Sequence, residues 1–304
     1  MRIALIGQAA FGEKVLAALL EAGEQLAVVF CPPDPPGKPG KMRLLAEEKG
    51  IPVLQPRKMR DPEVSEAYLQ YKPDLNVMAF VTDIVPQRIL DAPPLGSIQY
   101  HPSLLPRHRG GSAINWAIIM GETRTGLSIF WPDRGIDTGP LLLQREVAIG
   151  PDDTTGSLYF NQLFPLGVQA LVEAVQLVRE GKAPRLAQDE SQATYEPLCT
   201  EERTVIDWSQ PVEQVYNLIR GANPQPGASA TLNGQRVKFF DCRKTDHAHD
   251  RPAGEVLDVT PDGVLLAALG GALLLARLQP DGEGKQSAAE FAAAGRVRPG
   301  ERFE

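Results

Sequence analysis

The sequence predicts an α/β domain built on a parallel-rich sheet, followed by a smaller domain that folds as a β-barrel. Strand and helix patterns alternate over residues 1–185, which is typical of parallel βαβ units with helices on both faces of a sheet. After about Thr204 the pattern changes to short apolar runs separated by turn residues, as in antiparallel hairpins. A length of 304 residues suits two domains. We expect a first domain at 1–190, a linker at 191–203 and a second domain at 204–304.

Apolar runs that end at turn residues mark the strands of the first domain. We expect these strands at residues 2–6, 25–30, 74–80, 96–100 and 126–131. Helices are expected at 11–22, where apolar residues recur with helical spacing, and at 42–49. The acidic residues before Thr154 suit the start of a long helix that reaches about Glu180, and Pro165 should kink it. The polar, irregular stretch 181–193 is a candidate linker.

The second domain begins with a helix at 211–220 and continues as hairpins. The dipeptide Asn233-Gly234 stands between the apolar runs 228–232 and 236–240, and this is the strongest short-range hairpin signal. A Pro-Asp-Gly turn separates 255–259 from 264–269, and Gly270-Gly271 precedes a further strand at 273–278. Successive hairpins of this kind predict a small barrel.

Composition excludes several classes of protein. Hydrophobic residues make up 43% and charged residues 23%, which excludes a disordered chain, a coiled coil and a collagen-like chain. The net charge of −7 provides no global attraction to nucleic acid or to an anionic membrane, so we expect neither DNA nor membrane as a partner. The longest apolar run, residues 264–276, is shorter than the roughly 20 residues of a membrane-spanning helix. Because the N-terminus lacks the pattern of a signal peptide, we expect a cytoplasmic protein.

Cysteine and histidine are scarce. Three cysteines lie far apart and form no Cys-x-x-Cys pair, which indicates a reducing compartment and argues against disulfides or a zinc ribbon. With only four histidines in the chain, a metal site built on histidine is tightly constrained. His247 and His249 lie in a polar stretch and are expected to be solvated rather than ligands.

The turn after the first strand resembles a dinucleotide-binding turn but lacks its middle glycine. In the G-x-G-x-x-G pattern that glycine lets the backbone approach a pyrophosphate, and here the position is Ala9. We therefore expect a tight strand-to-helix turn and no nicotinamide cofactor, although the helix N-terminus could accommodate another anion.

Chemically reactive residues concentrate in two loops. Residues 101–111 follow a strand and combine His101 with two arginines and two glycines, and a second loop after a strand, 133–139, contains Asp137 among glycines. Ligands of parallel sheets bind at the carboxyl ends of strands, and two loops at one such edge can bring His101 and Asp137 together. A histidine beside a carboxylate is a usual arrangement for general acid–base chemistry near neutral pH.

Structural alternatives remain open for these residues. His101 could cap a loop, Asp137 could stabilise a turn, and Arg107 and Arg109 could lie on a solvated surface. A Ser-His-Asp hydrolase is disfavoured because neither Ser103 nor Ser112 lies in a G-x-S-x-G context.

The same two loops resemble the folate-dependent formyltransferase family. That family carries Asn-x-His followed by S-L-L-P-x-x-R-G, and later D-x-G-x-D-T-G. This sequence has His101, Ser103-Leu104-Leu105-Pro106 and Arg109-Gly110, and then Asp133, Gly135 and Asp137-Thr138-Gly139. The resemblance covers nearly the whole chain. It implies a Rossmann-like formyltransferase domain followed by an OB-like C-terminal domain.

Within the family, the resemblance is strongest to the N-terminal hydrolase domain of 10-formyltetrahydrofolate dehydrogenase. The similar segments include 100–110, 112–116, 129–131, 151–154, 193–196 and 219–221. Methionyl-tRNA formyltransferase is similar but less so, and usually carries a longer basic insertion after the second strand. Here that loop is short, Pro32–Met42, and its basic residues Lys38 and Lys41, with Arg43 beyond, could simply be solvated.

The resemblance implies 10-formyltetrahydrofolate as substrate, with no metal and no NAD. It implies that His101 and Asp137 are catalytic, and Gln99 occupies the position of the family Asn, whose amide helps to polarise the formyl oxygen. The pterin ring would lie between two loops. Substrate-binding residues implied in this way are Met78, Ala79, Phe80, Val81, Thr82, Asp83, Ile84, Ser103, Leu104, Arg107, Arg109, Gly110, Asp133, Arg134, Gly135 and Ile136. Arg107 or Arg109 would meet an anionic substrate group or hold a loop carbonyl.

The formyl acceptor defines the competing functions. We expect hydrolysis to formate and tetrahydrofolate, and the alternative is transfer to an amine, on methionyl-tRNA or on a small compound such as an amino sugar. A folate-binding module without turnover is disfavoured because His101 and Asp137 are both present. The dehydrogenase continues into a carrier segment and an aldehyde-dehydrogenase domain, whereas this sequence ends at Glu304, so we expect no oxidation of the formyl group.

Overall fold

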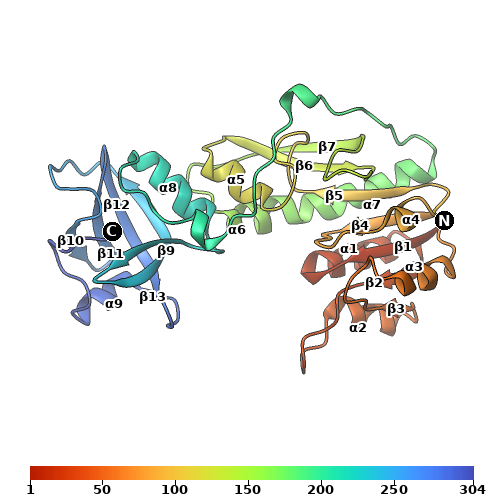
Figure 1. The fold of residues 1–304 in the computed structure, drawn as a ribbon, viewed down its shortest axis with the longest axis horizontal. Helices are drawn as coiled ribbons and strands as arrows, with labels where there is room; N and C mark the ends of the chain where they lie inside the picture. Colours follow the sequence, from red (N-terminus) through yellow and green to blue (C-terminus); the bar gives the residue numbers. More distant parts are fainter. The chain divides into compact units, whose positions relative to one another are not determined.

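The computed structural model describes residues 1–304, which divide into two compact units (Figure 1). The first unit contains residues 1–110, 126–147 and 161–195, and the second contains 111–125, 148–160 and 196–304. Each unit has its own apolar core. The expected α/β domain with a parallel-rich sheet, followed by a smaller β-rich domain, is confirmed.

The first unit is organised around a seven-stranded sheet in the order β3-β2-β1-β4-β5-β6-β7. Its strands are β1 (Arg2–Gly7), β2 (Gln25–Phe30), β3 (Val53–Leu54), β4 (Leu75–Ala79), β5 (Ser97–His101), β6 (Arg124–Phe130) and β7 (Leu141–Ala148). Its helices are α1 (Ala9–Glu21), α2 (Lys41–Glu48), α3 (Pro62–Leu69), α4 (Gln87–Leu90) and α7 (Phe164–Arg179). The neighbouring pairs from β3 to β5 are parallel.

Strand β6 runs antiparallel to β5, with His101 opposite Ser128 and Gln99 opposite Phe130. The sequence pattern suggests that the loop after β6 leaves from the carboxyl edge that β5 shares with β4 and β1. Because β6 is antiparallel to β5, the loop does not leave from that edge. It leaves the sheet beside Gln99, about 7 Å along the strand from His101 at two residues' spacing. The loop nevertheless brings Asp137 to the ring of His101.

Both faces of the first sheet are covered. In β1, Ile3 and Leu5 pack into one core with α1 and α7, while Ala4 and Ile6 pack into another with α3 and α4. Because successive side chains of a strand point to opposite faces, this alternation shows that β1 is buried on both sides.

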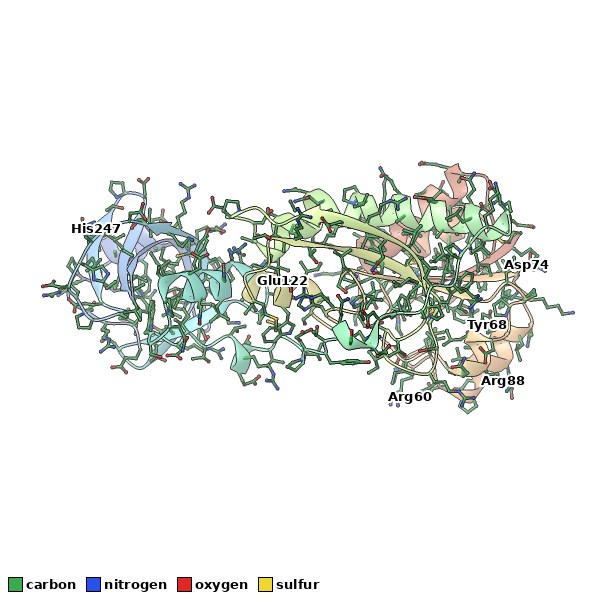
Figure 2. All side chains as sticks on the ribbon, turned by 90° about the horizontal axis from the view of Figure 1, so that it is seen from above. Arg60, Tyr68, Asp74, Arg88, Glu122 and His247 are labelled. Atoms are coloured by element: carbon green, nitrogen blue, oxygen red, sulfur yellow. The ribbon has the colours of Figure 1, made fainter.

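A buried hydrogen-bond network joins α3, β4 and β5. The Tyr68 hydroxyl, labelled in Figure 2, donates to Asn76 Oδ1 at 2.7 Å, and Asn76 Nδ2 donates to Ser97 Oγ and to the Ile89 carbonyl at 2.9 Å each. Ser97 Oγ in turn donates to the Leu90 carbonyl at 2.8 Å. Tyr68 and Asn76 are fully buried, so every polar group of the network depends on these partners.

The long helix expected from Thr154 to Glu180 is interrupted. Thr154 and Ser157 form a capping box at the start of α6 (Thr155–Leu158), a π-helical turn covers Tyr159–Leu163, and α7 then runs to Arg179. Pro165 is located in the first turn of α7, directly after the π-helical turn. The helix is therefore irregular next to the proline rather than sharply broken at it.

The second unit is an antiparallel barrel with helices α5 (Ala113–Ile119), α8 (Val212–Gly221) and α9 (Ala288–Ala293). Its strands are β8 (Ala228–Leu232), β9 (Gln235–Thr245), β10 (Val256–Thr260), β11 (Gly263–Ala268), β12 (Gly271–Pro280) and β13 (Gln286–Ser287). The expected β8–β9 hairpin is present, and both Asn233 and Gly234 adopt positive φ. Backbone hydrogen bonds from Glu301–Glu304 to Thr231 and Val256 bridge the edge strands β8 and β10 and close the sheet.

No helix in the structure combines the length and apolar character needed to cross a lipid bilayer. The three cysteines form no disulfide. Burial raises the pKa of the Cys31 and Cys199 thiols to about 11. His247 lies in the loop that follows β9 in the second unit (Figure 2).

Candidate active site

Strand β5 places Gln99 and His101 on one side of the sheet, because residues two apart in a strand point the same way. His101 ends the strand and is buried, with 5% of its surface exposed, while Gln99 is half-buried. An amide and an imidazole therefore project side by side from the carboxyl end of a parallel strand, where ligands of such sheets bind.

The imidazole of His101 is held between two oxygen atoms. Its Nε2 lies 2.8 Å from the His108 carbonyl oxygen, and its Nδ1 lies 3.4 Å from Oδ2 of Asp137. A carbonyl can only accept, which assigns an N–H to Nε2. Nδ1 is then the ring atom that faces the carboxylate, and a second proton placed there would lie between the two groups.

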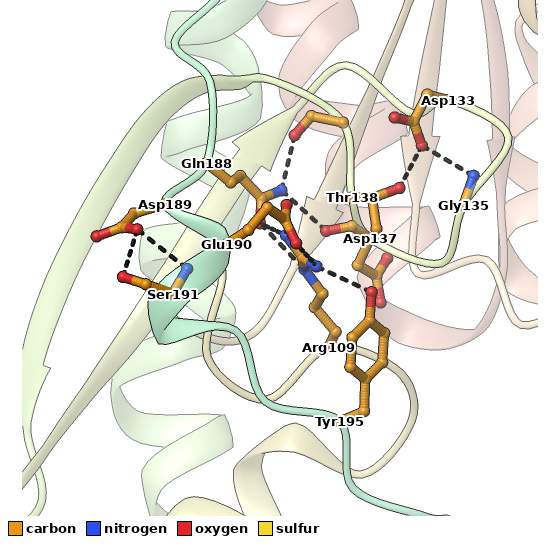
Figure 3. Close-up of polar contacts among 11 residues, drawn as sticks. Arg109, Asp133, Gly135, Asp137, Thr138, Gln188, Asp189, Glu190, Ser191 and Tyr195 are labelled. Atoms are coloured by element: carbon orange, nitrogen blue, oxygen red, sulfur yellow. Dashed lines mark hydrogen bonds and ion pairs between the residues drawn. The ribbon is translucent and has the colours of Figure 1, made fainter.

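Asp137 is fixed by its own turn. Its backbone adopts φ = 55°, and its Oδ2 accepts a hydrogen bond from the Gly110 amide at 2.8 Å. Asp133 stabilises the same loop by accepting from the Gly135 amide at 3.0 Å and from the Thr138 hydroxyl at 2.6 Å (Figure 3). The two loops that the sequence singled out are therefore directly linked, and the expected proximity of His101 and Asp137 is observed.

Arg109 has a different role from the expected one. Its side chain is 1% exposed, and its five N–H groups donate to Gln188, Glu190 and Tyr195 (Figure 3). Because a guanidinium has no further donor, Arg109 cannot also bind an anionic substrate group, nor does it hold a loop carbonyl. Glu190 is the main cause that raises the pKa of Arg109 further above its usual range.

Residues 186–195 form a strap that belongs to the first unit, although the sequence suggests a linker over part of this stretch. The strap pairs with β7 through Leu141 and Leu186. It also reaches the His101 loop, where the Thr194 hydroxyl accepts from the His108 amide at 2.8 Å and the Thr194 carbonyl accepts from the Arg109 amide at 3.0 Å. Polar residues here satisfy buried groups of the site.

The remaining residues of the 101–110 loop divide into buried and exposed ones. Ser103 is fully buried and its hydroxyl donates to the Arg107 carbonyl at 2.6 Å, so its side chain shapes the loop. Leu104 and Gly110 are half-buried, and Arg107 is exposed.

The segment 78–84 begins inside the core and ends in solvent. Met78 and Ala79 are buried among core residues, so they support the loop rather than line an open surface. Phe80 has φ = 59° and is 38% exposed, and Ile84 is 70% exposed. Of the rest, Val81 is half-buried and Thr82 and Asp83 are exposed. Asp83 Oδ2 accepts from the Met59 amide at 2.6 Å.

The loop 133–136 is exposed throughout. Asp133, Arg134 and Gly135 all lie at the surface, and Ile136 is 66% exposed. Exposed apolar side chains are therefore present on two loops, Phe80 and Ile84 on one and Ile136 on the other.

Sequence reasoning missed four residues that support these loops. Gln8 Nε2 donates to the Thr82 hydroxyl at 3.1 Å, and Gln188, Thr194 and Tyr195 belong to the strap. Gln8 follows the first strand, so its position at the carboxyl edge was a usable signal. Thr194 and Tyr195 lie in the segment 193–196 that carries the family resemblance, whereas Gln188 lies in a polar stretch whose pattern carries no signal.

Family models identify the chain. A model of the formyl transferase family matches residues 1–175, and a model of the formyl transferase C-terminal domain matches residues 199–296.

The chain belongs to the formyl transferase family.

Curated relatives of this formyl transferase family member include two kinds of enzyme. The mitochondrial 10-formyltetrahydrofolate dehydrogenase of Mus musculus is 44% identical over 310 residues, which covers 97% of this chain and 33% of the relative. The chain thus spans about a third of the length of that dehydrogenase. The methionyl-tRNA formyltransferase of Geobacter metallireducens is 38% identical over 309 residues, which covers 100% of this chain and 98% of the relative.

Solved structures share the fold at lower identity. HypX from Aquifex aeolicus, solved in complex with tetrahydrofolic acid, has a TM-score of 0.72 at 20% identity, covering 96% of this chain and 46% of HypX. The N-formyltransferase from Helicobacter canadensis, solved with folinic acid and dTDP-3-aminofucose, has a TM-score of 0.70 at 17% identity, covering 93% of this chain and 99% of that one. These similarities confirm the expected Rossmann-like formyltransferase fold.

Proposed function

We propose that this protein cleaves the formyl group from 10-formyltetrahydrofolate with water as the acceptor, giving formate and tetrahydrofolate. The observation that carries the proposal is the buried imidazole of His101, fixed at Nε2 by the His108 carbonyl and facing the Asp137 carboxylate through Nδ1. A histidine and a carboxylate held in this way can both accept and deliver a proton. Hydrolysis of an amide-type bond requires both transfers.

The Asp137 carboxylate has one oxygen available for the attacking water. Its Oδ2 is occupied by the Gly110 amide and faces His101, whereas Oδ1 accepts no hydrogen bond from the protein. In the proposed reaction the water oxygen bonds to the formyl carbon while Oδ1 takes one water proton. The N10–carbon bond then breaks and its electron pair stays on N10. The proton that Asp137 has taken from water passes to this nitrogen through His101 Nδ1, which faces the carboxylate, and the released formic acid loses its remaining proton to solvent.

Gln99 is the proposed donor to the developing oxyanion. It lies two residues before His101 on the same side of β5, so its amide N–H groups can point towards the formyl oxygen while His101 addresses the nitrogen. A preorganised donor at this position stabilises the charge that appears in the transition state more than the neutral substrate.

The folate ring system would bind between the loops 80–84 and 133–136. Phe80, Ile84 and Ile136 offer exposed apolar surface, and the backbone of 133–136 offers polar groups to the ring edge. Folate derivatives are bound in the structures of HypX and of the Helicobacter canadensis enzyme, which supports a folate substrate for this chain. Of the two arginines of the 101–110 loop, Arg107 is the exposed one.

Two observations favour water over transfer RNA as acceptor. Identity to the dehydrogenases, 44% over 97% of this chain, exceeds the 38% to methionyl-tRNA formyltransferase. Of the basic residues at the short 32–42 loop, Arg43 is also neutralised, because it pairs with Asp34 at 2.6 Å and with Glu47 at 2.7 Å, which leaves the exposed Lys38 and Lys41 as the cations there. Phosphate contacts require cations that remain available.

Transfer to an amine is the second candidate, because the methionyl-tRNA formyltransferase aligns over its full length and the Helicobacter canadensis enzyme was solved with an amino sugar nucleotide. An isotope experiment separates the two. Donor with a ¹³C-formyl group is incubated with the protein in ¹⁸O-water, alone and with methionyl-tRNA or dTDP-amino sugars, and the products are analysed by mass spectrometry. Hydrolysis predicts doubly labelled formate at a rate that added acceptors do not change. Formation of an N-formyl product with little formate would contradict it.

A further inference from the structure

The strap residue Gln188 contacts the backbone that carries the proposed base. Its Nε2 donates to the carbonyl oxygen of Asp137 at 2.9 Å and to that of Gly139 at 2.7 Å (Figure 3). Its Oε1 accepts from Arg109 Nε at 3.2 Å and from Arg109 Nη2 at 2.8 Å. Both N–H groups of the amide and its oxygen are thereby used within the protein.

Arg109 determines which way the Gln188 amide points. A guanidinium only donates and a backbone carbonyl only accepts, so the amide oxygen must face Arg109 and the amide nitrogen must face the Asp137 turn. Arg109 itself is held by Glu190 and Tyr195. The strap therefore presents a donor of defined orientation to the turn.

The turn at Asp137 needs such support. Asp137 has φ = 55°, a left-handed conformation that is uncommon for residues other than glycine. Such a conformation persists only when the surroundings determine it. The turn is also closely packed at Gly139, where a Cβ would collide with the Trp131 carbonyl oxygen.

We propose that Gln188 is a positioning residue for the reaction. Its amide holds the Asp137 and Gly139 carbonyls so that the Asp137 carboxylate faces His101 and the attacking water. Gln188 does not touch the reacting atoms and acts through Asp137. The inference rests on the proposed function, in which Asp137 is the base.

Two substitutions test the role of the amide. Gln188→Glu keeps the shape and can still accept from Arg109, but it cannot donate to the two carbonyls. Gln188→Ala removes both contacts. The matched control is Gln192→Ala, because Gln192 lies on the same segment, is exposed, and bonds only to Asp189.

We expect both Gln188 variants to lower kcat by about 10²-fold, as a displacement of about 1 Å at a reacting group does, while the KM for the folate changes little. Gln192→Ala should keep the wild-type kcat. Wild-type kcat in Gln188→Glu would overturn the proposal, as would a change confined to KM. If Gln188→Ala does not fold, the kcat of Gln188→Glu alone tests the proposal.

A spectroscopic readout separates this proposal from the proposed function. We expect the ¹⁵N chemical shift of His101 Nδ1 to change in Gln188→Glu towards its value in Asp137→Asn, and to stay at the wild-type value in Gln192→Ala. An unchanged shift in Gln188→Glu would reject the positioning role even if turnover fell. A wild-type protein that cleaves no formyl donor would reject the proposed function, whereas the shift would still show whether Gln188 positions Asp137.

Discussion

Nδ1 of His101 lies 3.4 Å from Oδ2 of Asp137, and the same oxygen accepts the Gly110 amide at 2.8 Å. One carboxylate oxygen thus joins the end of β5, the loop after it and the loop after β6. The other oxygen stays available to a ligand. This division of tasks within one carboxylate is the geometric basis of the proposed chemistry.

Asp137→Asn should abolish most turnover without disturbing the turn. Asparagine tolerates the left-handed backbone, and its amide oxygen can still accept from Gly110, but it carries no charge and cannot take a proton from water. We expect kcat to fall by about 10²–10⁴-fold. Stopped-flow or steady-state assays measure this loss, and an unchanged melting temperature serves as control. Retention of wild-type kcat would exclude Asp137 as the base.

Gln99→Ala tests the proposed oxyanion donor. Removal of one such donor is expected to lower kcat by about 10²–10³-fold while the folate Kd stays nearly constant, because the contact forms only as charge develops. Gln99→Asn shortens the side chain by one methylene, so its kcat shows whether catalysis depends on the length of the side chain that carries the amide. Equal kcat for wild type and Gln99→Ala would remove Gln99 from the mechanism.

We expect low pH to weaken the contact between the strap and the 101–110 loop. The Arg109 guanidinium holds the pKa of Glu190 below its usual range, so this ion pair stabilises the folded strap at neutral pH and the contribution is lost as pH falls through the folded-state pKa. We expect hydrogen exchange at the Arg109 and Thr194 amides to accelerate as pH falls through the carboxyl range, after correction for intrinsic rates. Glu190→Gln should show fast exchange already at neutral pH. Identical pH profiles for the two proteins would refute the assignment.

Tyr68→Phe should destabilise the first unit. The substitution leaves Asn76 Oδ1 buried without its donor, which costs about 1–3 kcal/mol. Chemical denaturation measures the change in the free energy of unfolding. Ser191→Ala, at an exposed position of the strap, is a matched surface control that should change stability little. A stability equal to wild type in Tyr68→Phe would show that water replaces the hydroxyl.

Local patterns in the sequence predicted much of the fold. The strand at 25–30 and the turn at Asn233-Gly234 were both correct, because β-branched runs and Asn-Gly turns act locally. The direction of β6 was not predicted, since a strand's apolar pattern is the same whether its neighbour is parallel or antiparallel. The short strand β3 and the helix α4 lack enough residues to show a period.

The proposed catalytic pair was visible in sequence, but the residues that support it were not. Glycines around Asp137 and a strand before His101 marked both loops. Arg109 was expected at the substrate because it lies beside His101 in the chain, yet its partners come from the strap, about eighty residues later. Only the tertiary fold shows that Gln188 and Glu190 meet it, since no local pattern encodes such a contact.

The central claim is that His101 and Asp137 cleave the formyl donor with water. The most direct test mixes purified protein with 10-formyltetrahydrofolate and no acceptor, and follows tetrahydrofolate and formate together. We predict that both products appear in equal amounts, and that His101→Ala still binds the folate but loses about 10²–10⁴-fold in kcat. Donor that binds to the wild-type protein but is not consumed, or formate release that persists in His101→Ala, would contradict the account.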